Sequence, residues 1–255
     1  MNDAGGGVTA PELTEEADRL VGLAEERGLH LRLLGGLAVC ELCPSAQLPA
    51  LRRHYPDIDF VTDQLSGAAT RSLLSENDYE GDQRFNALHG ETRLLFFHRS
   101  GAWQVDVFLG EFSMCHKIDL SRSLLPGRRT IPPSDLLLTK LQIVEMNLKD
   151  MKDVVAILLD HPVTANSDPE AIELGRFTAA TSKDWGLYTT VTGTLTRVRA
   201  DAAHLLDTDQ LARVEERITA IAEAMLSAPK SRKWKLRSRI GRRVLWYELP
   251  DEVGR

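Results

Sequence analysis

Cysteine is scarce in this chain, which has only Cys40, Cys43 and Cys115. So small and odd a number does not build a disulfide framework and indicates a reducing compartment. Cys40 and Cys43 form a Cys-x-x-Cys motif, and Cys115 precedes His116, so a four-ligand zinc site is one interpretation. We favour another, in which Cys40 lies on an apolar helix face and Cys43 ends that helix before Pro44, because a Cys-His dipeptide is a loose second ligand pair.

Long apolar runs are also missing. No stretch approaches the ~20 apolar residues that span a bilayer, and residues 1–7 lack the basic and apolar regions of a signal peptide. We therefore expect a cytoplasmic protein without a membrane partner. With 255 residues, 43% of them hydrophobic and 27% charged, the chain can bury a sizeable core in one large or two small domains.

Acidic residues are missing from one segment, although the net charge of the chain is −6. Residues 230–243 hold eight Lys or Arg and no acid, so the remainder carries −6 − 8 = −14. Trp234, Trp246 and Tyr247 lie in or just after this segment. Cations and aromatic rings together are typical of single-stranded nucleic-acid binding. The alternative is an amphipathic terminal helix that packs its tryptophan on the rest of the protein.

Hydrophobic periodicity predicts an alternation of helices and strands in the first half of the chain. Residues 1–10 are expected to be a disordered leader. Helices are predicted over 11–27, 37–42 and 66–77, and strands over 30–34 and 57–62. Three further β-like segments follow, separated by glycine-containing turns: 79–86, 92–98 and 103–109.

From Ser134 the pattern becomes helical. Ser134 is the predicted N-cap of one helix that runs through Lys140 toward Leu159, and further helices are expected over 169–177, 185–206 and 208–227. The fold class is therefore α/β (α+β), with a small mixed β-sheet flanked by helices and followed by a C-terminal helical bundle. The predicted domains are a sheet domain over 11–130, a helical bundle over 131–229 and a basic tail over 230–255.

The candidate chemistry begins at Gly35-Gly36, which closes an apolar run. Glycines let backbone N–H groups approach an anion closely. Asp57 and Asp59 alternate on a predicted strand, so their like charges share one face, which is costly without a cation. Asp106, on a later strand, is the candidate third carboxylate. Three such groups are the oxygen ligands that Mg²⁺ or Mn²⁺ prefers, and Asp106 could also accept a proton from an attacking hydroxyl.

This set of motifs resembles the nucleotidyltransferase superfamily typified by DNA polymerase β, over roughly residues 30–110. It is most similar to the small bacterial stand-alone members, which include antibiotic nucleotidyltransferases and type IV toxin–antitoxin nucleotidyltransferases. The resemblance implies that Gly35 and Gly36 bind the triphosphate and that Asp57, Asp59 and Asp106 bind metal. Many members have Gly-Ser, whose hydroxyl contacts a phosphate. This chain has two glycines, which implies a phosphate contact made mostly by backbone.

Two further features carry charge. Lys140 lies within an apolar helix face, so it either extends its amine to solvent or reaches a partner. Lys149-Asp150-x-Lys152-Asp153 resembles the Lys/Arg-Asp-x-x-Asp motif of the toxin nucleotidyltransferases, which implies that Lys140, Lys149, Asp150 and Asp153 line the nucleotide pocket. The alternative for the motif is a solvated helix face with an i,i+4 ion pair. The arginine pair Arg52-Arg53 is expected to be solvated.

Together these features predict a magnesium-dependent enzyme that moves an NMP from an NTP such as ATP to a hydroxyl and releases pyrophosphate. The acceptor would be an RNA, such as a tRNA 3′ end, in a toxin-like protein with an antitoxin protein as a possible partner. A small hydroxyl-bearing acceptor, such as an aminoglycoside, is the alternative that the acidic chain favours. A third hypothesis is a non-catalytic nucleotide-binding module that acts through a partner protein.

Overall fold

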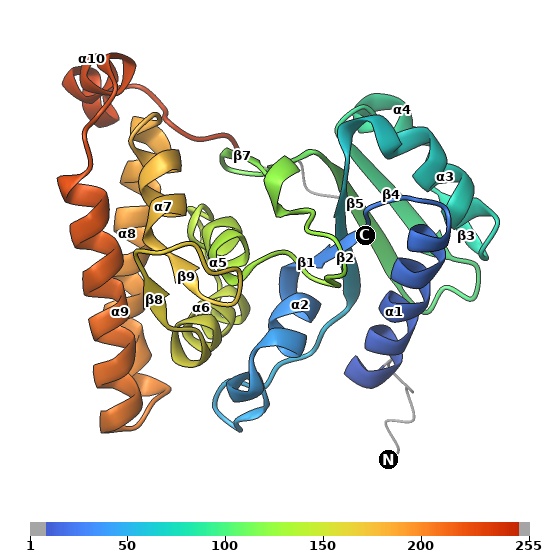
Figure 1. The fold of residues 1–255 in the computed structure, drawn as a ribbon, viewed down its shortest axis with the longest axis horizontal. Coiled ribbons are helices and arrows are strands. Elements are labelled where there is room, and N and C mark those ends of the chain that lie inside the picture. The colour runs from blue at the N-terminus through green and yellow to red at the C-terminus, as the bar shows by residue number, and fades with distance from the viewer. Residues whose placement is uncertain (1–8, 250–255) are drawn as a thin grey trace. The chain divides into compact units, whose positions relative to one another are not determined.

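The computed structural model describes residues 9–249 and divides into two compact units (Figure 1). The sheet unit takes in the chain up to Glu41 together with Arg53–Phe112 and Asp119–Ile131. The helical unit takes in Leu42–Arg52, Ser113–Ile118 and the chain from Pro132 onward. The leader expected over 1–10 falls mostly on residues 1–8, which lie outside the described residues. The predicted domain boundaries stay predictions.

The sheet unit is built on a five-stranded mixed sheet with the order β1-β2-β5-β4-β3. Strands β2 and β5 pair in parallel, and the other neighbours pair antiparallel. This architecture confirms the predicted α/β class with a small mixed sheet. Its strands are β1 (Arg32–Leu34), β2 (Asp57–Thr62), β3 (Tyr79–Gly81), β4 (Arg93–His98) and β5 (Gln104–Leu109). Its helices are α1 (Ala10–Glu26), α2 (Gly35–Leu42, whose last residue belongs to the helical unit), α3 (Gly67–Ser75) and α4 (Gln83–His89).

Local sequence explains where these elements begin and which face they bury. Thr9 caps α1 in a reciprocal capping box with Glu12, which satisfies backbone donors at the helix start. Along β2, Ile58 and Phe60 are fully buried, and the alternating residues Asp57 and Asp59 are half-buried. Burying side chains of the size of Ile58 or Phe60 contributes roughly 1.5–3 kcal/mol each. Strand β2 therefore turns apolar side chains to one face of the sheet and acids to the opposite face.

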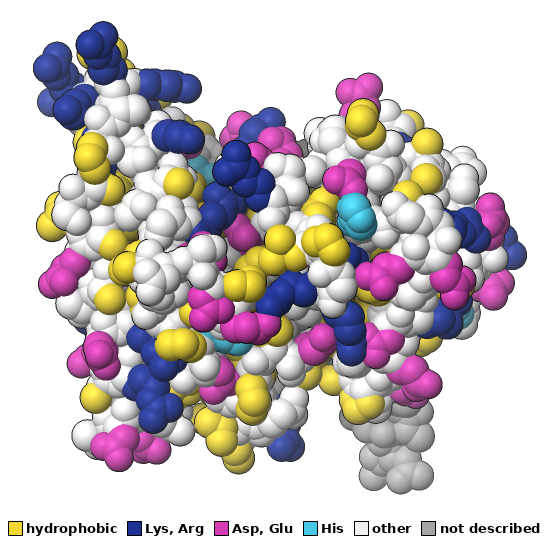
Figure 2. All heavy atoms as spheres, viewed as in Figure 1, with side chains coloured by type: hydrophobic (Ala, Val, Ile, Leu, Met, Phe, Trp, Pro, Cys, Tyr) yellow, Lys and Arg dark blue, Asp and Glu magenta, His cyan; other side chains and the backbone are white. Residues whose placement is uncertain are grey.

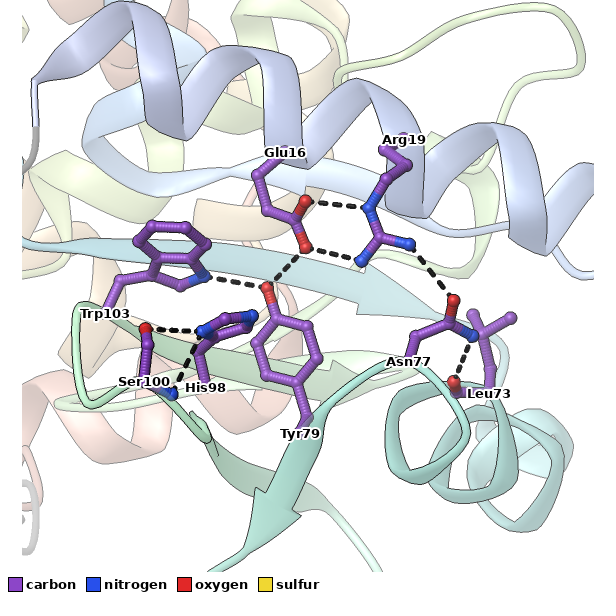
Figure 3. A network of polar contacts seen from close by, with 8 residues as sticks. All are labelled: Glu16, Arg19, Leu73, Asn77, Tyr79, His98, Ser100 and Trp103. Carbon is purple, nitrogen blue, oxygen red and sulfur yellow. Dashed lines mark hydrogen bonds and ion pairs between the residues drawn. The ribbon is translucent and has the colours of Figure 1, made fainter.

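A polar network joins α1 to the outer strands of the sheet (Figure 3). The Tyr79 hydroxyl donates to Glu16 Oε1 over 2.7 Å and accepts from Trp103 Nε1 over 2.8 Å. Arg19 donates to the Glu16 carboxylate and also to Asn77 Oδ1. Burial opposes the charge of Glu16, but the bonds from Arg19 and Tyr79 outweigh it and lower the pKa of Glu16 below its ordinary value of 4.5. This network fixes α1 over β3.

The helical unit holds α5 (Pro133–Leu141), α6 (Leu148–Asp160), α7 (Leu174–Thr181), α8 (Trp185–Asp201), α9 (Thr208–Ser227) and α10 (Arg232–Ile240). It also contains a short parallel pair, β8 (Val163–Thr164) and β9 (Ile172–Glu173). Another pair, β6 (Glu111–Ser113) with β7 (Lys117–Asp119), forms where the chain leaves the sheet unit and returns to it. Across residues 9–249, none of the helices combines the length and the apolar character that crossing a membrane requires.

The single helix predicted from Ser134 toward Leu159 is wrong. It is two helices, α5 and α6, separated by residues 142–147. Asn147 causes the restart, because its side chain accepts hydrogen bonds from the backbone N–H groups of Lys149 and Asp150. Pro132, rather than Ser134, is the N-cap residue of α5, and the Ser134 hydroxyl donates to the backbone oxygen of Ala171.

Two other segments also differ from their predictions. The β-like segment expected over 79–86 is a strand only as far as Gly81. Asp82 then caps α4 by accepting from the N–H of Phe85, so a local side-chain cap outweighs β propensity. The helix expected over 169–177 begins only at Leu174, because Ile172 and Glu173 pair with β8.

Candidate functional site

The carboxylate face of the sheet brings Asp57, Asp59 and Asp106 together through strand register. Asp59 and Asp106 are direct partners in the parallel pair of β2 with β5, so their side chains leave the sheet on the same side. Asp57 lies two residues before Asp59 and therefore shares that side. The negative charge of Asp57 is close enough to Asp106 to disfavour its ionised form. The three carboxylates predicted as metal ligands thus share one face.

The glycine turn lies directly against this face. Leu34, the last residue of β1, pairs with Asp59, and Gly35 then begins α2 with a φ of +72°. A Cβ built on Gly35 would lie only 2.7 Å from Asp59 Cγ. Two properties of glycine are needed here, the left-handed backbone and the absent side chain. Because a helix starts at this turn, its first N–H groups are available to an anion.

Arg53 covers the second glycine, which corrects the expectation that the Arg52-Arg53 pair is simply solvated. A Cβ on Gly36 would lie 2.7 Å from Arg53 Cζ. The guanidinium is held 4.3 Å from the centroid of the Tyr55 ring, and Nη1 donates to the backbone oxygen of His54 over 3.0 Å. A cation therefore lies beside the glycine turn. No periodicity or motif in the sequence distinguishes Arg53 from its exposed neighbour Arg52.

Asp106 is the most buried member of the carboxylate set, with only 2% of its surface exposed. Arg93 Nε donates to Asp106 Oδ1 over 2.8 Å, and Arg93 Nη2 donates to Oδ2, so one guanidinium engages both carboxylate oxygens. Burial raises the pKa of Asp106, the bonds from Arg93 oppose that shift, and the charge of Asp57 adds to it. The resulting pKa is raised from its ordinary value.

Arg93 is a site residue that sequence reasoning missed. It lies in β4, where Leu95 pairs with Asp106 and Arg93 pairs with Phe108. Parity in the antiparallel ladder therefore places Arg93 on the carboxylate face, over the ring of Phe108 at 4.8 Å. A lone arginine that opens the run Leu94–Phe97 was the available signal. Using it required knowledge of the pairing between β4 and β5.

Asp57, Asp59 and Asp106 have the chemistry that a divalent cation requires, because all three side chains supply hard oxygen ligands. They also lie on the same face of the sheet. The arrangement is incomplete in one respect. No cluster of three or more His, Cys, Asp or Glu within residues 9–249 is placed to hold a metal ion. In addition, both carboxylate oxygens of Asp106 accept hydrogen bonds from Arg93. Asp57 and Asp59 are the more exposed pair.

The residues predicted to line the nucleotide pocket form a second cluster, in the helical unit. Lys140 of α5 lies 3.2 Å from Asp150 Oδ1 and 2.8 Å from Asp153 Oδ2, both on α6. Only 2% of the Asp153 side chain is exposed, so the solvated-face alternative does not describe it, whereas Lys149 is exposed. Lys140 therefore serves here as the shared counter-ion of two carboxylates.

The cysteine motif forms no metal site among the residues that the structure covers. None of the three cysteines is in a disulfide within residues 9–249; Cys43 and Cys115 are buried, and Cys40 is half-buried near the end of α2. Helix α2 ends at Leu42, and Pro44 begins a short 3₁₀ turn. This placement agrees with the packing interpretation that we favoured over zinc.

Comparison with protein-family models gives no match for this chain, and comparison with curated proteins gives none either. Among solved structures, the chain is similar to the solution structure of the antibiotic-resistance factor ANT(2'')-Ia. The identity is 12%, the match covers 75% of this chain and 97% of that one, and the TM-score is 0.39. At these values the likeness carries no weight for activity, so the proposed function depends on the residues of the chain itself.

Proposed function

We propose that the protein is a divalent-metal-dependent nucleotidyltransferase, which moves an NMP from an NTP to an acceptor hydroxyl and releases pyrophosphate. One observation supports this proposal above the others. Three carboxylates share one sheet face, and the most exposed pair stands beside a glycine turn at the start of a helix. Negative charge gathered next to backbone N–H groups suits a cation and a triphosphate bound side by side.

In this proposal, Asp57 and Asp59 hold the cation, with Asp106 as the third ligand when Arg93 releases it. Mg²⁺ or Mn²⁺ would supply charge neutralisation of the phosphate oxygens. Gly35 and Gly36 bind the triphosphate through backbone N–H groups, and Arg53 adds a cation beside them. Lys140, Lys149, Asp150 and Asp153 remain proposed nucleotide-pocket residues on the family resemblance alone.

The reaction is an in-line displacement at the α-phosphorus. The acceptor oxygen forms a bond to that phosphorus, and the bond from the α-phosphorus to the oxygen bridging toward the β-phosphate breaks, so pyrophosphate leaves. The hydroxyl proton passes to Asp106, which lies on the same sheet face as Asp57 and Asp59. Holding the two reactants on one rigid sheet face lowers the entropic part of the barrier.

Pyrophosphate release tests this proposal. We expect purified protein with Mg²⁺, each NTP in turn and a panel of total RNA and aminoglycosides to release pyrophosphate with at least one acceptor. Asp57→Asn with Asp59→Asn should lower the rate about a thousandfold, since a metal clamp contributes several kcal/mol to such transition states. The matched control is Asp201→Asn with Asp209→Asn, which removes two exposed acids of the helical unit. Equal rates for the two double variants would contradict the proposal.

Two acceptor classes follow from different observations. The excess of acid over base in the whole chain favours a cationic small acceptor such as an aminoglycoside. The basic segment 230–243 favours RNA, and with it a toxin-like role restrained by an antitoxin protein. The same panel separates them, because the labelled NMP appears either in the RNA fraction or in the small-molecule fraction. Label in neither fraction, with NTP still bound, would favour the non-catalytic nucleotide-binding module.

A further inference from the structure

An aromatic cavity lies within the helical unit, between the start of α8 and α10. Its volume is about 420 Å³, within the range of sites that bind small molecules. Trp185, Trp234 and Trp246 line it, which are three of the four tryptophans in the chain. Soluble proteins rarely gather their largest aromatic rings around open space. This concentration points to a ligand with a flat ring.

Cations surround these rings. The Arg237 guanidinium lies 4.8 Å from the centre of the Trp185 ring, and that of Arg242 lies 5.4 Å from the centre of Trp246. Figure 2 shows Lys and Arg side chains gathered over α10. The exposed members of the segment are Arg232, Lys233, Lys235, Arg239, Arg242 and Arg243. Asp184 also lines the cavity, so one acid lies among the cations, but the net charge of the lining residues is positive.

The wall formed by Trp246 is firmly held. Trp246 Nε1 donates to Thr190 Oγ1 over 3.1 Å, and that hydroxyl also contacts His116 Nε2 at 2.8 Å. A Cβ on Gly186 would lie 2.6 Å from the backbone oxygen of Trp246, so glycine permits the close approach of this segment to α8. The backbone N–H of Glu248 donates to the oxygen of Cys115. The ring of Trp246 is therefore preorganised, which lowers the entropy lost on binding.

Arg237 shapes the opposite side. Its Nη1 donates to the backbone oxygen of Gly241 over 2.7 Å, and Nη2 donates to that of Val244 over 2.8 Å. These bonds fold the chain after α10 back toward α8. The guanidinium carbon lies over the Trp185 ring while the N–H groups of Arg237 donate these two hydrogen bonds. One residue thus supports both the aromatic stack and the turn that carries Arg242 and Arg243.

We infer that this cavity and the cations around it, which we call the tail site, bind single-stranded nucleic acid. A base would enter the cavity and stack on one of the tryptophan rings that line it, and the flanking phosphates would contact Lys233, Arg232 and Arg239 of α10. Stacking on aromatic rings accepts any base, and the phosphate contacts follow the backbone, so the expected ligand is an RNA strand read with little sequence preference. This inference goes beyond the nucleotidyl-transfer proposal and does not depend on it.

An anionic membrane surface is the competing partner. Leu236 is 62% exposed and Ile240 is 48% exposed on the basic helix α10, as in helices that lie on bilayers. Two observations favour RNA. The helix has only nine residues, and Leu236 and Ile240 line the same cavity as the tryptophans, so the apolar side of α10 borders a site that a flat base can enter.

The test is fluorescence anisotropy with a labelled, unstructured RNA of about twelve nucleotides, within the site sizes of single-strand binders. Arg232→Gln/Lys233→Gln/Arg239→Gln should weaken binding and reduce the slope of log K against log salt by about 2, since each phosphate contact contributes about 0.7. The matched control, Arg84→Gln/Arg99→Gln/Arg213→Gln, removes three exposed cations from outside the tail site and should leave that slope unchanged. Equal slopes for the two triple variants would overturn the inference.

Stacking is tested separately. Trp185→Leu should weaken RNA binding about tenfold, whereas Trp185→Phe, which keeps an aromatic face, should retain most of the affinity. Circular dichroism melts establish that both variants are folded. Sedimentation with phosphatidylcholine–phosphatidylserine vesicles tests the competing hypothesis, that the tail site binds an anionic membrane. Vesicle binding without RNA binding, or equal RNA affinity for the leucine and phenylalanine variants, would contradict a base in the cavity.

Discussion

The two carboxylate clusters of the molecule differ in how their charge is compensated. In the helical unit, one lysine, Lys140, is shared by Asp150 and Asp153 at 3.2 and 2.8 Å. In the sheet unit, Arg93 directs two hydrogen bonds to the carboxylate of Asp106. Asp57, on the same face, has no ion-pair partner among residues 9–249. The first cluster is internally neutralised to a large extent and braces two helices, whereas the second keeps negative charge on a partly exposed face, where the proposed cation would bind.

The largest expected effect is on the helical cluster. Lys140→Met removes the cation that Asp153, only 2% exposed, contacts. Breaking a buried pair on one side typically costs 3–5 kcal/mol, so we expect a loss of about 3 kcal/mol in the free energy of unfolding, measured by urea denaturation. Lys149→Met is the control, because Lys149 is exposed on α6 and should change stability by no more than about 0.5 kcal/mol.

This pair of variants sharpens the comparison, because Lys140 also carries a proposed nucleotide role. If Lys140→Met unfolds like the wild type and loses only NTP affinity, the lysine is a ligand-binding group and the brace interpretation fails. A stability loss that Asp153→Asn partly restores in the double variant would establish the brace.

The next effect concerns the sheet cluster. Arg93→Gln removes the guanidinium from Asp106 and should cost about 2 kcal/mol near neutral pH. Burial already raises the pKa of Asp106, and the substitution should raise it further. The folded state then binds the proton more tightly than the unfolded state, so the variant gains stability as pH falls and loses it as pH rises through the folded pKa. Urea unfolding across a pH series measures this; a pH-independent loss would contradict it.

A third effect tests the close approach at the glycine turn. Gly35→Ala introduces a methyl group 2.7 Å from Asp59 Cγ at a φ of +72°. Gly101→Ala is a matched control with a φ of +73° and no atom within 4 Å of the added methyl. Backbone strain alone should cost about 1 kcal/mol at Gly101, whereas strain with overlap should cost about 2 kcal/mol at Gly35. Equal losses in thermal or urea unfolding would mean that Asp59 moves aside easily.

The smallest expected effect is at Glu16, an acid compensated by neighbours on a half-exposed surface. Its pKa is lowered, so its contribution to stability is present above the unfolded value and is lost as pH falls through the folded one. Glu16→Gln should cost about 0.5 kcal/mol near neutral pH, as exposed pairs do, and should flatten the dependence of stability on pH near 4. An unchanged pH profile would contradict the network in Figure 3.

Much of the sheet could be predicted because alternation along a strand is a local property. The bounds of β2 and the shared side of Asp57 and Asp59 follow from residue types and a period of two. The pairing of Asp59 with Asp106 depends on the order of the strands in the sheet. The succession of strands after β2 in the sequence suggests that order but does not determine it. The glycine pair at the start of α2 was also predicted, since few other residues adopt that turn.

The remainder depends on tertiary contacts that no local pattern encodes. Arg93 was missed because its role requires the register of β4 against β5. The break between α5 and α6 was missed because one apolar period continues through it, while the cap of Asn147 starts a new helix. The pairing of Lys140 with both aspartates requires two helices to meet, and sequence spacing alone does not place them together.

The central claim is that the sheet carboxylates bind a divalent cation, and Mn²⁺ binding followed by electron paramagnetic resonance tests it most directly. Free aqueous Mn²⁺ gives a strong six-line signal that weakens when the ion is bound. Wild-type protein without added nucleotide, which would itself bind Mn²⁺, should reduce this signal in proportion to added protein. The Asp57→Asn/Asp59→Asn variant should leave the signal intact, and Asp201→Asn/Asp209→Asn should behave as the wild type. A signal that falls equally with all three proteins, or with none of them, would contradict the claim.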